Sequence, residues 1–113
     1  MSIEAMSTAA APVRIDPRLE SEIRAAESEQ INVEAVFALR SAEPGKKRPG
    51  PEETKRLAEQ AIRRAVESSG AAPQKVNIFE NLGSIFVLAA PAFMNVFLEQ
   101  PEIAVASSNR AGK

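Results

Sequence analysis

Two periods of hydrophobic residues alternate along this chain, and they predict its strands and helices. Over residues 31–40 the apolar side chains fall at every second position, which is the period of a half-buried strand. Over residues 51–69 they recur three and four positions apart, which is typical of an amphipathic helix. Gly70 predicts the end of this helix, and residues 75–79 predict a short strand after it.

The segment of residues 82–110 predicts a strand, a short helix and a second strand with few connecting residues. Residues 85–90 form a short apolar run between a glycine and a proline, which favours a buried strand. Pro91 suits the first turn of a helix, and Pro101 predicts its end. Alternation of larger and smaller apolar residues over 103–106 then predicts the last strand.

The rest of the chain predicts a leader, a helix and a loop. Residues 1–14 are rich in Ala and Ser without a clear period, and we expect a disordered leader there. Asp16 before Pro17 resembles a helix cap before a first-turn proline, so a short helix is predicted over residues 16–28. Residues 41–50 contain two prolines and two glycines, which predict a mobile connection.

The order of these elements predicts the fold. After the N-terminal helix the order is β-α-β-β-α-β, which is the ferredoxin-like pattern. We therefore expect an α+β fold in which a four-stranded antiparallel sheet carries two helices on one face, plus the extra N-terminal helix. The single domain is predicted over residues 15–110, and residues 111–113 are predicted to form a flexible C-terminal tail. The second sheet face would then be left open for function.

Composition narrows the function classes. The 113 residues, 44% of them hydrophobic, are enough for one small domain with a modest core. The chain contains neither Cys nor His, which excludes disulfides and thiolate metal sites and removes the usual general base. We therefore expect a protein that is not an enzyme and that holds no cofactor and no metal.

The charge balance gives no reason to expect a polyanionic partner. The chain has 14 basic and 15 acidic residues and a net charge of −1, so nothing draws it to nucleic acid or to an anionic membrane. No basic segment precedes the short alanine run at residues 9–11, and no apolar run reaches membrane-spanning length. We therefore expect a cytoplasmic protein.

Three clusters of residues resemble binding sites, but we expect each to have a structural role or to be solvated. The large apolar residues within 93–97 have helical spacing, which predicts core packing rather than a recognition patch. The basic run at residues 46–48 lies in the predicted loop and is expected to be solvated. The glutamates within residues 52–67 alternate with Lys and Arg at helix-pair spacing, which favours charge pairs over a metal site.

The second half of the chain resembles a known family, the subtilisin propeptide-like inhibitors. This family includes the propeptides of secreted subtilases and free-standing inhibitors. The resemblance extends roughly over residues 31–110 and is most specific after Gly83. It rests on a Leu-Gly turn, an apolar strand that ends in a small residue, a helix and a Pro-hydrophobic step, which are here Leu82-Gly83, residues 85–89, residues 91–98 and Gln100-Pro101-Glu102-Ile103.

The resemblance implies a binding mechanism. In this family the exposed sheet face packs on two surface helices of a subtilisin-like serine protease, and the C-terminal tail lies in the substrate cleft as an extended, product-like peptide. Ser and Asn stand here where many members carry acidic residues that cap the protease helices. The resemblance assigns protease binding to the end of the chain, namely to Ser107, Ser108, Asn109, Arg110, Ala111, Gly112 and Lys113.

The chain departs from the family pattern at its end. Its tail is shorter than that of typical propeptides, and no protease domain follows Lys113, so we expect a free-standing inhibitor or a folding chaperone supplied as a separate chain. The alternative is a non-inhibitory ferredoxin-like module that binds another protein, or a second copy as a homo-oligomer, through its open sheet face. A third hypothesis is a regulatory domain that binds a small ligand.

Overall fold

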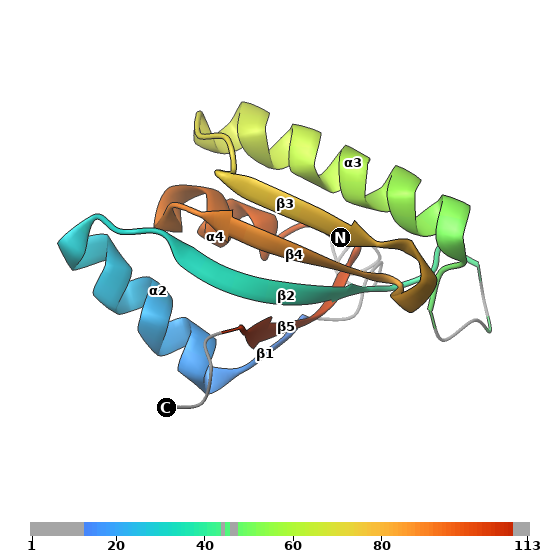
Figure 1. Cartoon of the computed structure of the whole chain (residues 1–113), viewed down its shortest axis with the longest axis horizontal. Coiled ribbons are helices and arrows are strands. Elements are labelled where there is room, and N and C mark those ends of the chain that lie inside the picture. Colours follow the sequence, from blue (N-terminus) through green and yellow to red (C-terminus); the bar gives the residue numbers. More distant parts are fainter. Residues whose placement is uncertain (1–12, 44, 46–47, 110–113) are drawn as a thin grey trace, which may run out of the picture.

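The computed structural model describes residues 13–43, 45 and 48–109. These residues form an α+β domain, as the sequence predicts, and its elements are shown in Figure 1. In chain order the elements are β1 (Arg14–Ile15), α2 (Pro17–Glu29), β2 (Val33–Leu39), α3 (Pro51–Ser69), β3 (Lys75–Phe79), the 3-10 turn η1 (Glu80–Leu82), β4 (Ser84–Ala89), α4 (Pro91–Phe97) and β5 (Ile103–Ser108).

The strands form one five-stranded sheet in the order β1-β5-β2-β4-β3. Strands β5, β2, β4 and β3 are antiparallel neighbours and have the ferredoxin-like order that the sequence predicts. Strand β1 adds a fifth strand, which pairs in parallel with β5 through Arg14 and Ile15. The prediction of a four-stranded, wholly antiparallel sheet is therefore wrong at this edge.

The fifth strand gave no signal in the sequence because it is only two residues long, which is too short to show a period. Arg14 belongs to this strand and not to the predicted leader. The remainder of the predicted leader, residues 1–12, lies outside the described residues. Strand β1 leads directly into α2, which the sequence placed correctly to within one residue.

The three helices of the described chain share one core with one face of the sheet. Alternate residues of β2 are buried against them, while the residues between are only partly buried. Phe37 of β2 lies at the centre, with its ring edge-on to Phe97 at a centroid distance of 4.7 Å, and Phe93 stacks on Phe97 at 5.3 Å. The predicted core role of residues 93–97 is thereby confirmed, since Phe93, Met94 and Phe97 are fully buried.

Helix caps fix the ends of the two longer helices. Asp16 Oδ1 accepts a hydrogen bond from Arg18 N at 2.9 Å at the start of α2, as expected of an N-cap carboxylate. Gly70 ends α3 with a positive φ of 74°, a conformation that glycine adopts without steric cost. Both caps were predicted from the sequence.

An ion pair between a half-exposed arginine and a largely buried carboxylate joins α3 to the start of β5. Arg64 of α3 pairs with the carboxylate of Glu102, whose side chain is only 10% exposed. The backbone N–H of Arg40 donates to the Glu102 carbonyl at 2.9 Å, and Arg40 Nη2 donates to the Ile103 carbonyl at 2.7 Å. These contacts hold the segment before β5 against both the end of β2 and the helix layer.

Candidate protein-interaction face

Among the residues that the structure describes, no helix covers one face of the sheet. Figure 1 views this face directly, with α4 behind the strands. We call it the open face and define it by the residues that the strand register places on it: Glu34, Val36, Ala38, Lys75, Asn77, Phe79, Ser84, Phe86, Leu88, Val105 and Ser107. Arg14 of β1 continues it at one edge, opposite Val105.

The register arranges the open face in rows across the sheet. In the first row Leu88 of β4 lies between Lys75 of β3 and Glu34 of β2. In the second row Phe86 lies between Asn77 and Val36, and Ser107 of β5 lies next to Val36. The third row consists of Phe79, Ser84, Ala38 and Val105 in the order β3, β4, β2 and β5. The rows therefore place apolar side chains in the middle of the face.

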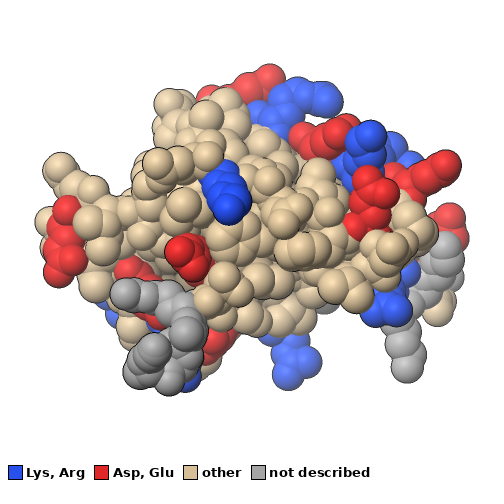
Figure 2. Space-filling model, in the orientation of Figure 1, with Lys and Arg blue, Asp and Glu red and all other residues tan. Residues whose placement is uncertain are grey.

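The chemistry of this face is typical of an interaction surface. Val36, Phe86 and Leu88 are only partly buried, and Val105 remains 36% exposed. Figure 2 shows the same side of the molecule, where mostly uncharged residues cover the strands and many charged side chains gather near the border. An apolar patch with a polar border is a common feature of protein-binding surfaces.

The predicted binding residues at the chain end do not all lie on the open face. Ser107 does, opposite Val36. Ser108 lies on the helix side, where its Oγ donates to the Glu22 carboxylate at 2.9 Å. Asn109 N donates to the Glu34 carbonyl at 3.3 Å, so this residue continues the pairing of β5 with β2. Residues 110–113 of the predicted site lie outside the described residues.

Asp16 holds the last strand from the N-terminal side. Its Oδ2 accepts a hydrogen bond from Ser108 N at 3.2 Å, and its own N–H donates to the Ala106 carbonyl at 2.9 Å. The Arg18 and Ser108 N–H groups together lower the pKa of Asp16, because both hydrogen bonds favour the charged carboxylate. The start of the domain therefore fixes the direction in which β5 leaves the sheet.

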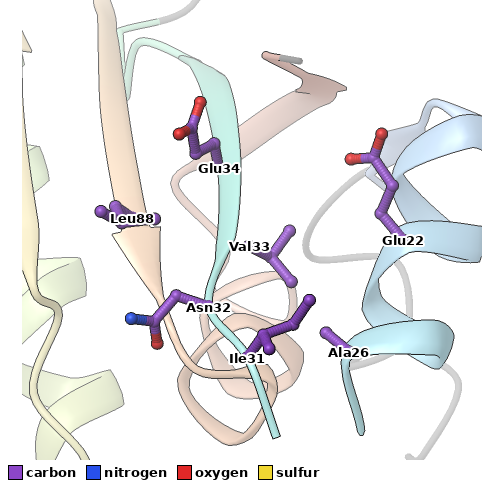
Figure 3. Close-up of a pocket in the computed structure, with 7 residues that line it drawn as sticks. All are labelled: Glu22, Ala26, Ile31, Asn32, Val33, Glu34 and Leu88. Atoms are coloured by element: carbon purple, nitrogen blue, oxygen red, sulfur yellow. The ribbon is translucent and has the colours of Figure 1, made fainter. Parts of the chain in front are cut away.

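A small pocket lies beside one corner of the open face (Figure 3). It has a volume of about 140 Å³ and is lined by Glu22, Ala26, Ile31, Asn32, Val33, Glu34 and Leu88. Figure 3 shows Glu22 and Glu34 on opposite sides of it, with small apolar side chains between them. Ligand pockets for small molecules are usually roughly 300–1,000 Å³, so this pocket suits a single side chain of a partner better than a metabolite.

The charged clusters singled out in the sequence have no visible role in this face. Lys46 and Lys47 lie outside the described residues, and Arg48 is exposed. Glu53 accepts hydrogen bonds from Ser41 Oγ and Ala42 N, both at 3.0 Å, and so fastens the loop after β2 to α3. Across the described ranges, acidic residues form no cluster of three that could hold a metal ion.

Sequence reasoning missed the central residues of the open face. Phe86 and Leu88 lie in a run that is apolar on both sides of β4, so period two could not be seen there. Glu34 was correctly placed on the opposite side of β2 from the buried residues, and the same alternation identifies Val36 and Ala38. Only the pairing of strands shows that these residues form one surface.

Among the described residues, no helix is both long enough and apolar enough to cross a bilayer. Comparison of the chain with models of known protein families, with curated proteins and with solved structures found no match.

Proposed function

We propose that this chain is a protein-binding domain that docks its open face on a folded partner, and that the partner is a subtilisin-like serine protease. The observation that carries the proposal is the row arrangement of Val36, Phe86 and Leu88, which leaves an apolar patch partly exposed at the centre of a sheet face that no described helix covers. The resemblance of residues 31–110 to subtilisin propeptide-like inhibitors supplies the identity of the partner.

The direction of β5 supports a role for the chain end. Ser107 lies on the open face, so a partner bound there also meets the start of the tail. An extended tail could then add to the partner as a strand, with backbone hydrogen bonds giving affinity and alternate side chains entering pockets. Ser107 offers a hydroxyl for a free helix N-terminus, which preserves the capping hydrogen bond without the charge of an acidic residue.

Binding without chemistry is consistent with the residues available. A chain that lacks both His and Cys cannot build a His- or Cys-based nucleophile and base. We therefore propose an inhibitor, or a chaperone that assists folding of the protease from a separate chain, and no cofactor is needed for either role. We place this activity in the cytoplasm, because a chain without Cys needs no oxidising compartment.

The second candidate function is a non-inhibitory interaction module that uses the open face alone. One observation favours it: the N–H and hydroxyl of Ser108 bind Asp16 and Glu22 of the same domain. Part of the predicted protease-binding segment is therefore already engaged within the fold. A module of this kind would bind its partner equally well without the tail.

The test is a titration of the full chain into a panel of subtilisin-like proteases while hydrolysis of a chromogenic peptide is followed. Removal of residues 110–113, which leaves the contacts of Asn109 intact, should abolish inhibition. Val36→Lys should weaken it by placing a charge in the apolar patch. Arg56→Ala on the exposed side of α3 serves as the control.

The outcomes separate the two candidates. Inhibition that depends on both the tail and Val36 supports the inhibitor. Binding that depends on Val36 but not on residues 110–113, without inhibition, supports the interaction module. Failure to bind or inhibit any member of the panel would overturn the choice of protease as the partner.

A further inference from the structure

We infer that two copies of this chain associate through their open faces about a two-fold axis that runs along β4, so that Lys75 of each copy meets Glu34 of the other. This inference concerns the chain without any protease and does not depend on the proposed inhibition. It uses the same surface, so association of two copies and docking on a partner would exclude each other.

The positions of the two charges select a second copy as the occupant. Lys75 and Glu34 lie in the same row on opposite sides of Leu88. Because neighbouring strands are about 4.8 Å apart, each charged residue lies about one strand spacing from β4. A two-fold rotation about an axis along β4 exchanges these positions, which brings each Lys75 opposite the Glu34 of the other copy.

Other face-to-face arrangements leave these charges without partners. A two-fold axis perpendicular to the strands would place the first row on the third, so that Lys75 would meet Phe79. An axis moved from β4 to β2 would bring Phe86 opposite Ser107, place Glu34 near its own equivalent and move Lys75 away from Glu34. Burying a charge without a partner is costly, so the axis along β4 is favoured.

Side-chain size agrees with the same axis. In the third row Phe79 and Ala38 lie on opposite sides of Ser84, so the rotation places the largest side chain of the row over its smallest apolar one. In the second row Phe86 lies near the axis and meets its equivalent. Large and small residues that face each other in this way can interdigitate across two sheets packed about 10 Å apart.

The dimensions of the open face predict a weak association. With the axis along β4, only β3, β4 and β2 of each copy face each other. Strands of about six residues at roughly 3.3 Å per residue, and three strands about 4.8 Å apart, give a face of about 14 × 20 Å. Two such faces bury about 600 Å² in total, which is well below the standard size of specific interfaces. The dimer should therefore be reversible and should yield to a partner that binds more tightly.

The first measurement is sedimentation equilibrium of the full chain from about 1 μM to about 1 mM, the range of weak association constants. The apparent mass should rise towards that of a dimer. Lys75→Glu and Glu34→Lys should each weaken association about tenfold or more, because each replaces the pairs by like charges. Arg63→Glu and Glu59→Lys, which make the same charge changes on the exposed side of α3, should leave it unchanged.

The decisive step is to mix the two open-face variants. Lys75→Glu and Glu34→Lys, each unable to pair with itself, should associate with each other, because the mixed pair restores opposite charges at both contacts. A folding defect cannot produce this rescue, and circular dichroism of each variant checks its fold. Lys75→Met provides a second variant that removes the charge while keeping a long side chain.

Two results would overturn the inference. One is a monomer at every concentration. The other is a dimer that both single variants leave intact, since its interface would then lie elsewhere. Removal of residues 110–113 should not change the dimer, so loss of protease inhibition and loss of self-association can be told apart.

Discussion

Asp16 binds both ends of the domain at once: its Oδ1 caps α2 through Arg18 N, and its Oδ2 accepts from the backbone N–H of Ser108, 92 positions further along the chain. Strand β1 and helix α2 precede the ferredoxin-like core in the chain. The second contact of Asp16 therefore attaches this N-terminal addition to the last strand of the core. Strand β1 pairs with the outer edge of β5, and Asp16 at the start of α2 binds the N–H of Ser108, so both restrain the strand from which the predicted tail leaves. Restraint of this kind lowers the entropy lost when a tail binds.

Replacement of Asp16 by Ala should lower the melting temperature and loosen the end of β5. The substitution removes the N-cap of α2 and the acceptor for Ser108 N together. Hydrogen exchange should show faster exchange at Ser108 and in the first turn of α2, while the centre of β4 stays protected. Asp16→Asn keeps an acceptor oxygen for the cap and should lose less; equal losses in both variants would show that the charge, not the cap, matters.

Acid should remove the contribution of Asp16. Its pKa is lowered in the folded protein, chiefly by the Arg18 N–H and then by the Ser108 N–H. The charged carboxylate therefore stabilises the fold fully above the unfolded-state pKa of about 4, and this contribution is lost as the pH falls through the lowered folded-state pKa. Urea unfolding between pH 6 and 2 should show a smaller acid-dependent loss for Asp16→Asn than for the native chain; parallel curves would contradict this assignment.

The ion pair of Arg64 and Glu102 predicts an asymmetric mutational response. Arg64→Met should lower the free energy of unfolding by about 1–3 kcal/mol, because the largely buried carboxylate of Glu102 then loses its partner. Glu102→Gln leaves a half-exposed arginine and should cost less. The double variant Arg64→Met, Glu102→Met should be more stable than Arg64→Met alone, as measured by urea unfolding. If the double variant were the less stable, an unpaired carboxylate at Glu102 would not be the cause of the loss in Arg64→Met.

Much of the fold follows from local signals. The alternation in residues 31–40 correctly predicts which side chains of β2 are buried, because a strand with one covered face must alternate. Proline at the start of α3 and glycine at its end predict its bounds to the residue. The strand and helix order then limits the arrangement to the ferredoxin-like pattern of the four longer strands.

The remainder depends on contacts between distant segments. A two-residue strand such as β1 exists only because β5 offers it a free edge, so Arg14 carries no signal of its own. The second hydrogen bond of Asp16 joins residues at the two ends of the domain, which local pattern cannot reveal. Likewise, only the strand pairing shows that Lys75 and Glu34 lie in one row at equal distances from β4.

The same substitution at two neighbouring residues of β4 should affect stability and association to different degrees. Ile85 is fully buried, so Ile85→Ser should cost about 3 kcal/mol or more, because it leaves a cavity and buries a hydroxyl. Phe86 faces the open side, so Phe86→Ser should cost only about 1 kcal/mol or less, the scale of cross-strand pairs, yet weaken both self-association and partner binding. Urea unfolding and sedimentation measure the two effects. Because a slip of one residue would exchange the two sides of the strand, a more destabilising Phe86→Ser would refute the register on which the open face rests.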